Sequence, residues 1–231
     1  MMNQTIKRIV LMLVALTFSS ALQAQSKLSI TDYVSQTFIH GMPYNEAMQY
    51  EQSEVATLKA MLSDHQQHQH WPNIVVMLEI IGDKHIVDDI ITFIEEDRTG
   101  DFGNSFYRAK TAALYGLGYV INHHNSKKAL KYLQSSLAPD VWQQRGLVGK
   151  ASYQKDAITR NNDMSKYAML GLALSGTQSA QNILTNLKVT KLKQPGFQRQ
   201  VSAIIDNAIV ENEKIKTAGL SEYYSQQDQV K

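Results

Sequence analysis

Residues 112–133, AALYGLGYVINHHNSKKALKYL, contain two apolar patterns that decide the expected fold. Apolar and small side chains recur every three or four residues up to Ile121, and the same spacing resumes from Ser126 to Leu133. This spacing places apolar side chains along one stripe of a helix. The polar residues between the two patterns predict a turn, so the stretch indicates a hairpin of two helices.

The same pattern occurs in two further segments, residues 74–94 (IVVMLEIIGDKHIVDDIITFI) and 167–187 (YAMLGLALSGTQSAQNILTNL). Leu78, Leu117 and Leu172 correspond in the first helix. The matched positions of the second helix are Val87, Ile90, Ile91 and Ile94, then Ser126, Ala129, Leu130 and Leu133, then Ala180, Ile183, Leu184 and Leu187. The first two copies are 39 residues apart in both helices, and an insertion around 139–164 lengthens the next step. Agreement of two offsets indicates an internal repeat, in which stacked pairs bury the faces that one pair leaves open.

Small residues on the first helices predict that helix axes approach closely. They are Ala113, Gly116, Gly118, Ala168, Gly171 and Ala173. Glycine in a helix interior costs about 1 kcal/mol relative to alanine, so its presence there argues for a packing role.

The segments 112–133 and 167–187 resemble HEAT repeats, particularly the short HEAT-like type of phycobilisome lyases, and 74–94 resembles a more divergent copy. This resemblance covers about residues 72–190 and implies a right-handed α-solenoid. The family's aspartate and arginine after the turn are poorly matched, with Asp83 and no equivalent arginine. A tetratricopeptide or Sel1-like array is the alternative, against which the 39-residue step and the position of Ala129 argue.

The whole chain contains helical signals and no strand pattern, which predicts an all-α fold. The expected helices span 30–39, 44–62, 72–81, 85–96, 105–121, 126–137, 156–161, 165–174, 177–187 and 196–216. We expect one domain over 25–216, with core repeats at about 72–96, 105–137 and 165–188, and a flexible tail over 217–231.

The first 24 residues have the features of a secretory signal. Lys7 and Arg8 precede an apolar run over 9–18, and small and polar residues follow up to Ala24, the expected cleavage site. This run is too short to span about 30 Å of hydrocarbon. We therefore expect a periplasmic or secreted protein without a stable membrane span.

Charge is distributed unevenly along the 231 residues. Residues 25–106 have 4 basic and 13 acidic side chains, a net charge of −9, whereas 107–231 have 17 and 8, a net charge of +9. Such polarity can steer a charged partner, or the opposite charges of successive elements can pair with each other. The absence of cysteine excludes disulfides and thiolate metal sites. A neutral mature chain without a basic-aromatic motif does not indicate nucleic-acid binding.

Two groups of histidines are candidate metal ligands. They are His65, His68 and His70 beside Asp64, and His85, His123 and His124 in the turns of the first two repeats. Neutral imidazoles bind zinc, copper or nickel. Solvated polar loops are the structural alternative for both groups.

A third set of residues has two possible roles, which are ion pairs that align successive repeats and contacts with a binding partner. Adding 39 residues to Asp88 and Asp89 leads to Lys127 and Lys128, so ion pairs between successive repeats are expected. The same helices present a candidate partner-binding surface, continued by the insertion with its aromatic and arginine residues. The candidates are Asp88, Asp89, Glu95, Lys127, Lys128, Lys131, Tyr132, Trp142, Arg145 and Arg160. Trp142 could equally cap the apolar core of its hairpin.

No familiar catalytic motif is present in the sequence, such as G-x-S-x-G or H-E-x-x-H. We therefore expect a scaffold that binds a protein or peptide and needs no cofactor. The alternatives are a periplasmic metal-binding protein that uses the histidines, and a HEAT-like lyase or hydrolase with a site on the insertion.

Overall fold

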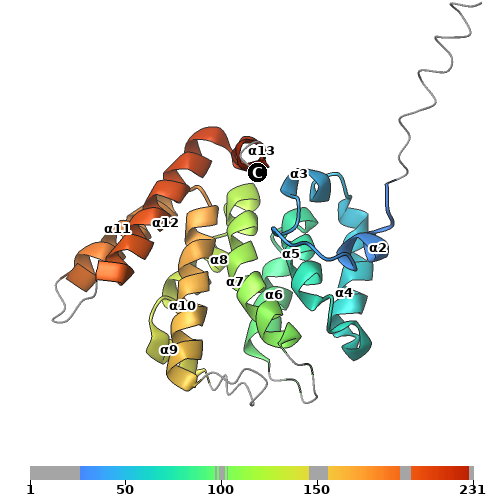
Figure 1. Cartoon of the computed structure of the whole chain (residues 1–231), viewed down its shortest axis with the longest axis horizontal. Coiled ribbons are helices and arrows are strands. Elements are labelled where there is room, and N and C mark those ends of the chain that lie inside the picture. Colours follow the sequence, from blue (N-terminus) through green and yellow to red (C-terminus); the bar gives the residue numbers. More distant parts are fainter. Residues whose placement is uncertain are drawn as a thin grey trace, which may run out of the picture.

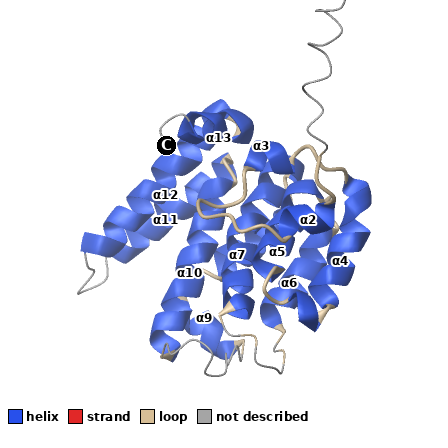
Figure 2. Cartoon of the chain, turned by 45° about the vertical axis from the view of Figure 1, so that its right-hand side comes forward, coloured by secondary structure: helices blue, strands red, loops and turns tan. Residues whose placement is uncertain are grey.

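The computed structural model describes residues 27–96, 98, 102, 104–145, 156–192 and 199–228, and the predicted signal sequence lies outside them. Within these ranges the chain is all-helical, with twelve α-helices, two 3-10 helices and no strand (Figure 2). The first helices are α2 (Ile30–Val34), α3 (Tyr44–Ala47), η1 (Gln52–Glu54), α4 (Val55–Ser63), η2 (His65–Gln67), α5 (Trp71–Ile81) and α6 (Ile86–Glu95). The others are α7 (Ser105–His124), α8 (Lys127–Ser135), α9 (Pro139–Gln144), α10 (Ala157–Leu174), α11 (Gln178–Leu192), α12 (Arg199–Ala218) and α13 (Leu220–Asp228).

Four helices form the centre of the molecule, in the order α5, α7, α10 and α12, and each packs against the next (Figure 1). The intervening helices bridge these neighbours. α6 contacts α5 and α7, α8 contacts α7 and α10, and α11 contacts α10 and α12. Because α7 contacts both α5 and α10 extensively, it occupies the middle of the core.

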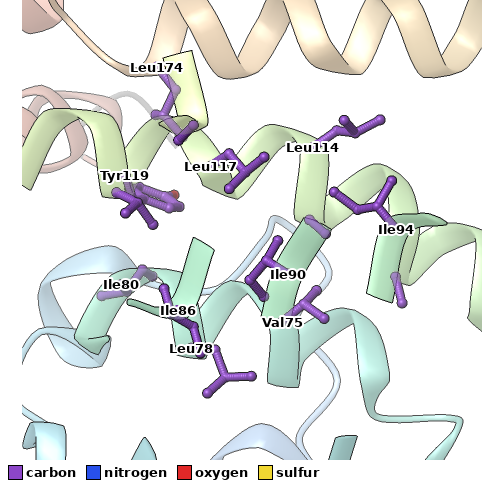
Figure 3. Packing of buried hydrophobic residues seen from close by; sticks show 14 of the residues in the cluster. Val75, Leu78, Ile80, Ile86, Ile90, Ile94, Leu114, Leu117, Tyr119 and Leu174 are labelled. Atoms are coloured by element: carbon purple, nitrogen blue, oxygen red, sulfur yellow. The ribbon is translucent and has the colours of Figure 1, made fainter. Parts of the chain in front are cut away.

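The matched positions of the first helices are buried in the structure. Leu78, Leu117 and Leu172 are all fully buried in one continuous apolar core. The second helices match less well, since Ile90, Ile94, Ala129, Leu133 and Leu184 are buried, whereas Ile91, Leu130, Ile183 and Leu187 are partly buried. Figure 3 shows side chains of α5, α6 and α7 meeting in this core. The apolar spacing in the sequence therefore identified the side chains that join neighbouring helices.

The expected close approach of helices occurs between α7 and α10. A Cβ built on Gly118 would overlap the carbonyl oxygen of Gly171, and one built on Gly171 would overlap the carbonyl oxygen of Leu114. The two glycines thus bring the helix backbones into direct contact. Gly116 has another role, since a Cβ there would overlap the carboxylate of Glu79 on α5.

Several predicted boundaries were wrong. The helix expected over 44–62 is divided into α3, η1 and α4, because an extended residue at Glu51 lets Tyr44 and Tyr50 be buried separately. The helices expected over 156–161 and 165–174 form one helix, α10, since no glycine or proline separates them. The sequence prediction missed α9, which begins at Pro139 in the insertion.

The C-terminal residues also differ from the expected flexible tail, because they include α13. Gly219, at φ +80°, ends α12 and turns the chain, and Leu220 is buried. α13 contacts α3, so a late segment packs against an early one at the same edge of the molecule (Figure 1). Asn45 on α3 donates hydrogen bonds to the carbonyl of Ser221 (3.2 Å) and to Ser225 Oγ (3.0 Å).

We expect the substitution Gly171→Ala to destabilise the protein although alanine favours helix formation. The added methyl group would overlap the α7 backbone, and such overpacking typically costs about 1–3 kcal/mol. Thermal and urea unfolding of the variant would measure this loss. Thr185→Ala, at an exposed position on α11, is the control and should change stability little. A Gly171→Ala variant as stable as the wild type would contradict the close approach.

Candidate functional site

A small pocket lies where the C-terminal ends of α5 and α7 meet the segment between α3 and η1. Its volume is about 280 Å³. Nine residues line it, namely Met48, Tyr50, Gln52, Ile80, Ile81, Gly82, Asp83, His123 and His124. We call it the histidine pocket. Its lining combines an apolar part, from Met48 and the two isoleucines, with a polar part that includes two imidazoles and one carboxylate.

The pocket exists because both long helices end at the same level. α5 ends at Gly82, whose extended backbone turns the chain toward α6. α7 continues to His124, where Asn125 adopts the left-handed conformation at φ 49°. His123 and His124 therefore lie in the last helical turn of α7 and not in the interhelical turn, as the sequence had suggested.

His124 is oriented by the end of α5. Its Nε2 lies 3.0 Å from the carbonyl oxygen of Gly82. Since a carbonyl only accepts hydrogen bonds, Nε2 carries a proton and donates a hydrogen bond to Gly82. The ring is exposed, so its Nδ1 can contact a bound molecule.

His123 is the more buried imidazole. Its Nε2 lies 2.8 Å from the hydroxyl of Tyr44. Burial lowers the pKa of His123, the neighbouring His124 lowers it further, and a hydrogen bond with the backbone of Ile80 acts in the opposite direction. His123 is therefore a neutral side chain that joins α3 to α7.

Asp83 supplies the negative charge of the pocket. The backbone N–H of His85 donates a hydrogen bond to its Oδ1 at 2.8 Å. This bond lowers the pKa of Asp83, burial partly opposes it, and the side chains of His85, Gln52 and His124 lower it further. Asp83 is accordingly a carboxylate at neutral and mildly acidic pH. The structure thus brings His85, His123 and His124 together around a residue that the sequence analysis did not assign to a site.

The other histidines predicted as metal ligands lie outside the histidine pocket, and two of them contact neighbouring side chains. His68 Nδ1 lies 2.9 Å from Ser105 Oγ, and His65 packs edge-on against Trp71 and Phe102. His70 occupies the position before the first residue of α5, without a capping hydrogen bond from its side chain. Among the described residues, no group of three or more histidine, aspartate or glutamate side chains is arranged to hold a metal ion.

The predicted ion pairs between repeats are present in part. Asp88 on α6 pairs with Lys128 on α8, so an ion pair joins the two repeats, although the 39-residue step relates Asp88 to Lys127. Asp89 instead pairs with Lys59 on α4, with 2.5 Å between the charged atoms. Lys127 and Lys131 are exposed on α8. These exposed pairs link α4, α6 and α8, and each contributes about 0–1 kcal/mol.

Four of the partner-binding candidates meet around Arg145, namely Glu95, Tyr132, Trp142 and Arg145 itself. The guanidinium lies 4.6 Å from the ring centroid of Tyr132 and 4.7 Å from that of Trp142, and its Nε is 3.5 Å from Glu95. Trp142 is fully buried, and its Nε1 donates to the carbonyl of Ser136 and to Ser165 Oγ, both at 3.1 Å.

Trp142 therefore caps the core, and Arg145 covers it. Arg160 lies apart from this cluster in the contacts described, with its guanidinium bound to Asn161 Oδ1 at 3.2 and 3.1 Å.

The sequence analysis missed a buried polar layer beside the pocket. Tyr44 stacks between Tyr119 and Tyr224, with ring centroids 5.5 and 5.1 Å apart, and the hydroxyls of Tyr119 and Tyr224 are 2.7 Å apart. Glu79 is fully buried on α5, and neither of its carboxylate oxygens has a hydrogen-bond partner. Burial raises the pKa of Glu79 well above its usual value of 4.5. The sequence analysis assigned no role to Glu79, although it lies between the apolar residues Leu78 and Ile80.

The comparisons with known proteins give no family. The chain matches no protein-family model, no curated protein and no solved structure. In the part of the chain that the structure describes, none of the helices has the length and apolarity needed to cross a membrane.

We expect Glu79→Gln to make the protein relatively more stable as the pH rises above 4.5. The folded state holds a proton on Glu79 that the unfolded state releases, so folding stability falls with increasing pH. The wild type should lose on the order of 1.4 kcal/mol for each unit by which the folded pKa exceeds the unfolded one. Urea unfolding of both proteins between pH 4 and 8 would measure the difference. Parallel pH profiles would show that Glu79 is charged in the folded protein.

Proposed function

We propose that this protein is a non-enzymatic binding protein whose partner is a protein or peptide, and that the histidine pocket is the anchoring point for one side chain of that partner. The observation that supports this proposal is the pocket's composition. An apolar part formed by Met48, Ile80 and Ile81 adjoins the carboxylate of Asp83 and the imidazole of His124, which can form hydrogen bonds. Convergence of a few polar groups on an apolar hollow is typical of binding sites.

The size of the pocket favours a side chain over a larger ligand. Pockets for drug-sized molecules and cofactors have volumes of about 300–1,000 Å³. At about 280 Å³ the histidine pocket falls below this range. A partner segment lying across the surface could insert a single residue there, which is how anchoring residues act in many interfaces.

The proposal includes the architecture and the compartment expected from the sequence. We infer that the stacked pairs α5–α6, α7–α8 and α10–α11 form a short HEAT-like solenoid, an inference supported by the equal burial of the matched leucines. We further propose that the protein is exported, on the basis of the pattern over residues 1–24. The surface of α6 and α8 remains a second contact area for the partner, since Lys127 and Lys131 are exposed there.

Blocking the pocket should abolish capture of the partner. The Gln52→Trp substitution places a large ring at an exposed lining position and should fill the pocket without disturbing the core. Thr57→Trp on α4 is the matched control, because Thr57 is exposed and does not line the pocket. Crosslinked affinity capture from the native compartment would compare both variants with the wild type.

We expect the wild type and Thr57→Trp to recover the same proteins and Gln52→Trp to lose them. Equal thermal unfolding midpoints of the three proteins would establish that folding is unchanged. Recovery of an identical set by Gln52→Trp would overturn the assignment of the pocket.

A further inference from the structure

The negative charge at the histidine pocket limits the kind of side chain that it can receive. Asp83 lines the pocket as a carboxylate that accepts hydrogen bonds from the His85 backbone and the Gln52 side chain, and a carboxylate retains acceptor capacity beyond two such bonds. His124 lies beside it with its Nε2 bound to the carbonyl of Gly82. Asp83 favours a ligand that donates hydrogen bonds and carries a positive charge.

The opposite side of the pocket lies in the field of further carboxylates. Burial raises the pKa of Tyr50, and the negative charges of Glu46, Glu54 and Asp32 raise it further, in that order. These carboxylates surround the lining residue Tyr50 from α3, η1 and α2. A cation entering the pocket therefore meets the negative charge of Asp83 on one side, and on the other side the three carboxylates around Tyr50, which are partly offset by Lys27.

This segment already binds one ammonium group of the same chain. Lys27 Nζ lies 4.0 Å from the centroid of the Tyr50 ring and donates to the carbonyl of Gln49 at 2.6 Å. Tyr50 itself is fixed by a hydrogen bond from its hydroxyl to the carbonyl of Leu28 at 3.0 Å. The contact shows that the surroundings of Tyr50 accommodate a basic side chain with its charge over an aromatic ring.

The apolar lining of the pocket suits the methylene groups of a basic side chain. Lysine and arginine have three or four methylene groups that pack on apolar surface while the charged end stays in a polar environment. Met48 is 44% exposed, and Ile81 is partly exposed beside it in the pocket. Lys84 is exposed and does not line the pocket, so the basic groups that act on Asp83 are the imidazoles of His85 and His124, and no lysine or arginine lines the pocket.

We propose that the histidine pocket recognises a basic side chain, lysine or arginine, presented by the partner. Its charged end binds Asp83 and its methylenes lie on Met48 and Ile81. This inference rests on the proposed function and specifies the chemistry of the partner at that site.

The test is a titration of the full chain with small model compounds, monitored by NMR. The signals monitored are those of the His124 ring and of the Gln52 side-chain amide. The probes are N-acetyl-arginine amide, N-acetyl-lysine amide and two uncharged analogues, N-acetyl-citrulline amide and N-acetyl-norleucine amide. Asp83→Asn removes the proposed charge. Asp89→Asn is the control, since it removes the same charge from an exposed position on α6 outside the pocket.

We expect the arginine and lysine probes to shift both signals and to bind about two- to fivefold more tightly than the uncharged analogues. Asp83→Asn should abolish this preference, and Asp89→Asn should keep it. If norleucine binds as well as lysine, the pocket still receives a side chain but the inference about charge is wrong. If no probe shifts either signal, the pocket assignment of the proposed function fails as well. If Asp83→Asn and Asp89→Asn lose the preference for charged probes equally, the preference comes from the overall charge of the protein, and the proposed role of Asp83 is wrong.

Discussion

The contact of α7 with the helices on both of its sides determines the rest of the structure. On one side, Gly118 and Gly171 allow the backbones of α7 and α10 to touch, a distance that any side chain at these positions would prevent. On the other side, Gly116 leaves space for the Glu79 side chain of α5. Since α7 is fixed between two neighbours, its C-terminal turn reaches the end of α5. The histidine pocket results from that placement, because His123 and His124 come from α7 and Asp83 follows α5.

The core around α7 contains more polar groups than its apolar spacing implies. The tyrosines that join α3, α7 and α13 satisfy one another through hydroxyl contacts, as Tyr119 and Tyr224 do. Glu79 differs, since both of its carboxylate oxygens lack a partner. A buried carboxyl group without a partner avoids the large cost of burying a charge by holding a proton. The stability of the α5–α7 contact is therefore linked to pH, whereas the tyrosine layer depends on α13 remaining packed against α3.

The fold could be predicted well where periodic apolar residues continue over many turns. The burial of the matched leucines and the close approach at Gly171 followed from a repeat that is visible in the sequence, because the same packing problem recurs in each helix pair. The prediction failed over 44–62, where burial of Tyr50 depends on α2, and over 217–231, where α13 gains its apolar contacts from α3 and α7. The role of Trp142 could not be predicted from its residue type. A tryptophan that caps the core and a tryptophan that binds a partner can occur in the same sequence pattern.

The sequence by itself determined that this protein is helical, which side chains form its core and where helix axes approach most closely, since these follow from local spacing and side-chain size. Only the tertiary structure decided which polar residues meet. His124 and Gly82 are 42 positions apart in the chain, and Tyr44 and Tyr224 are at opposite ends of the described region. Their contacts depend on where helices end and on how the chain returns, and these properties arise from packing between segments and not from the pattern within any one of them.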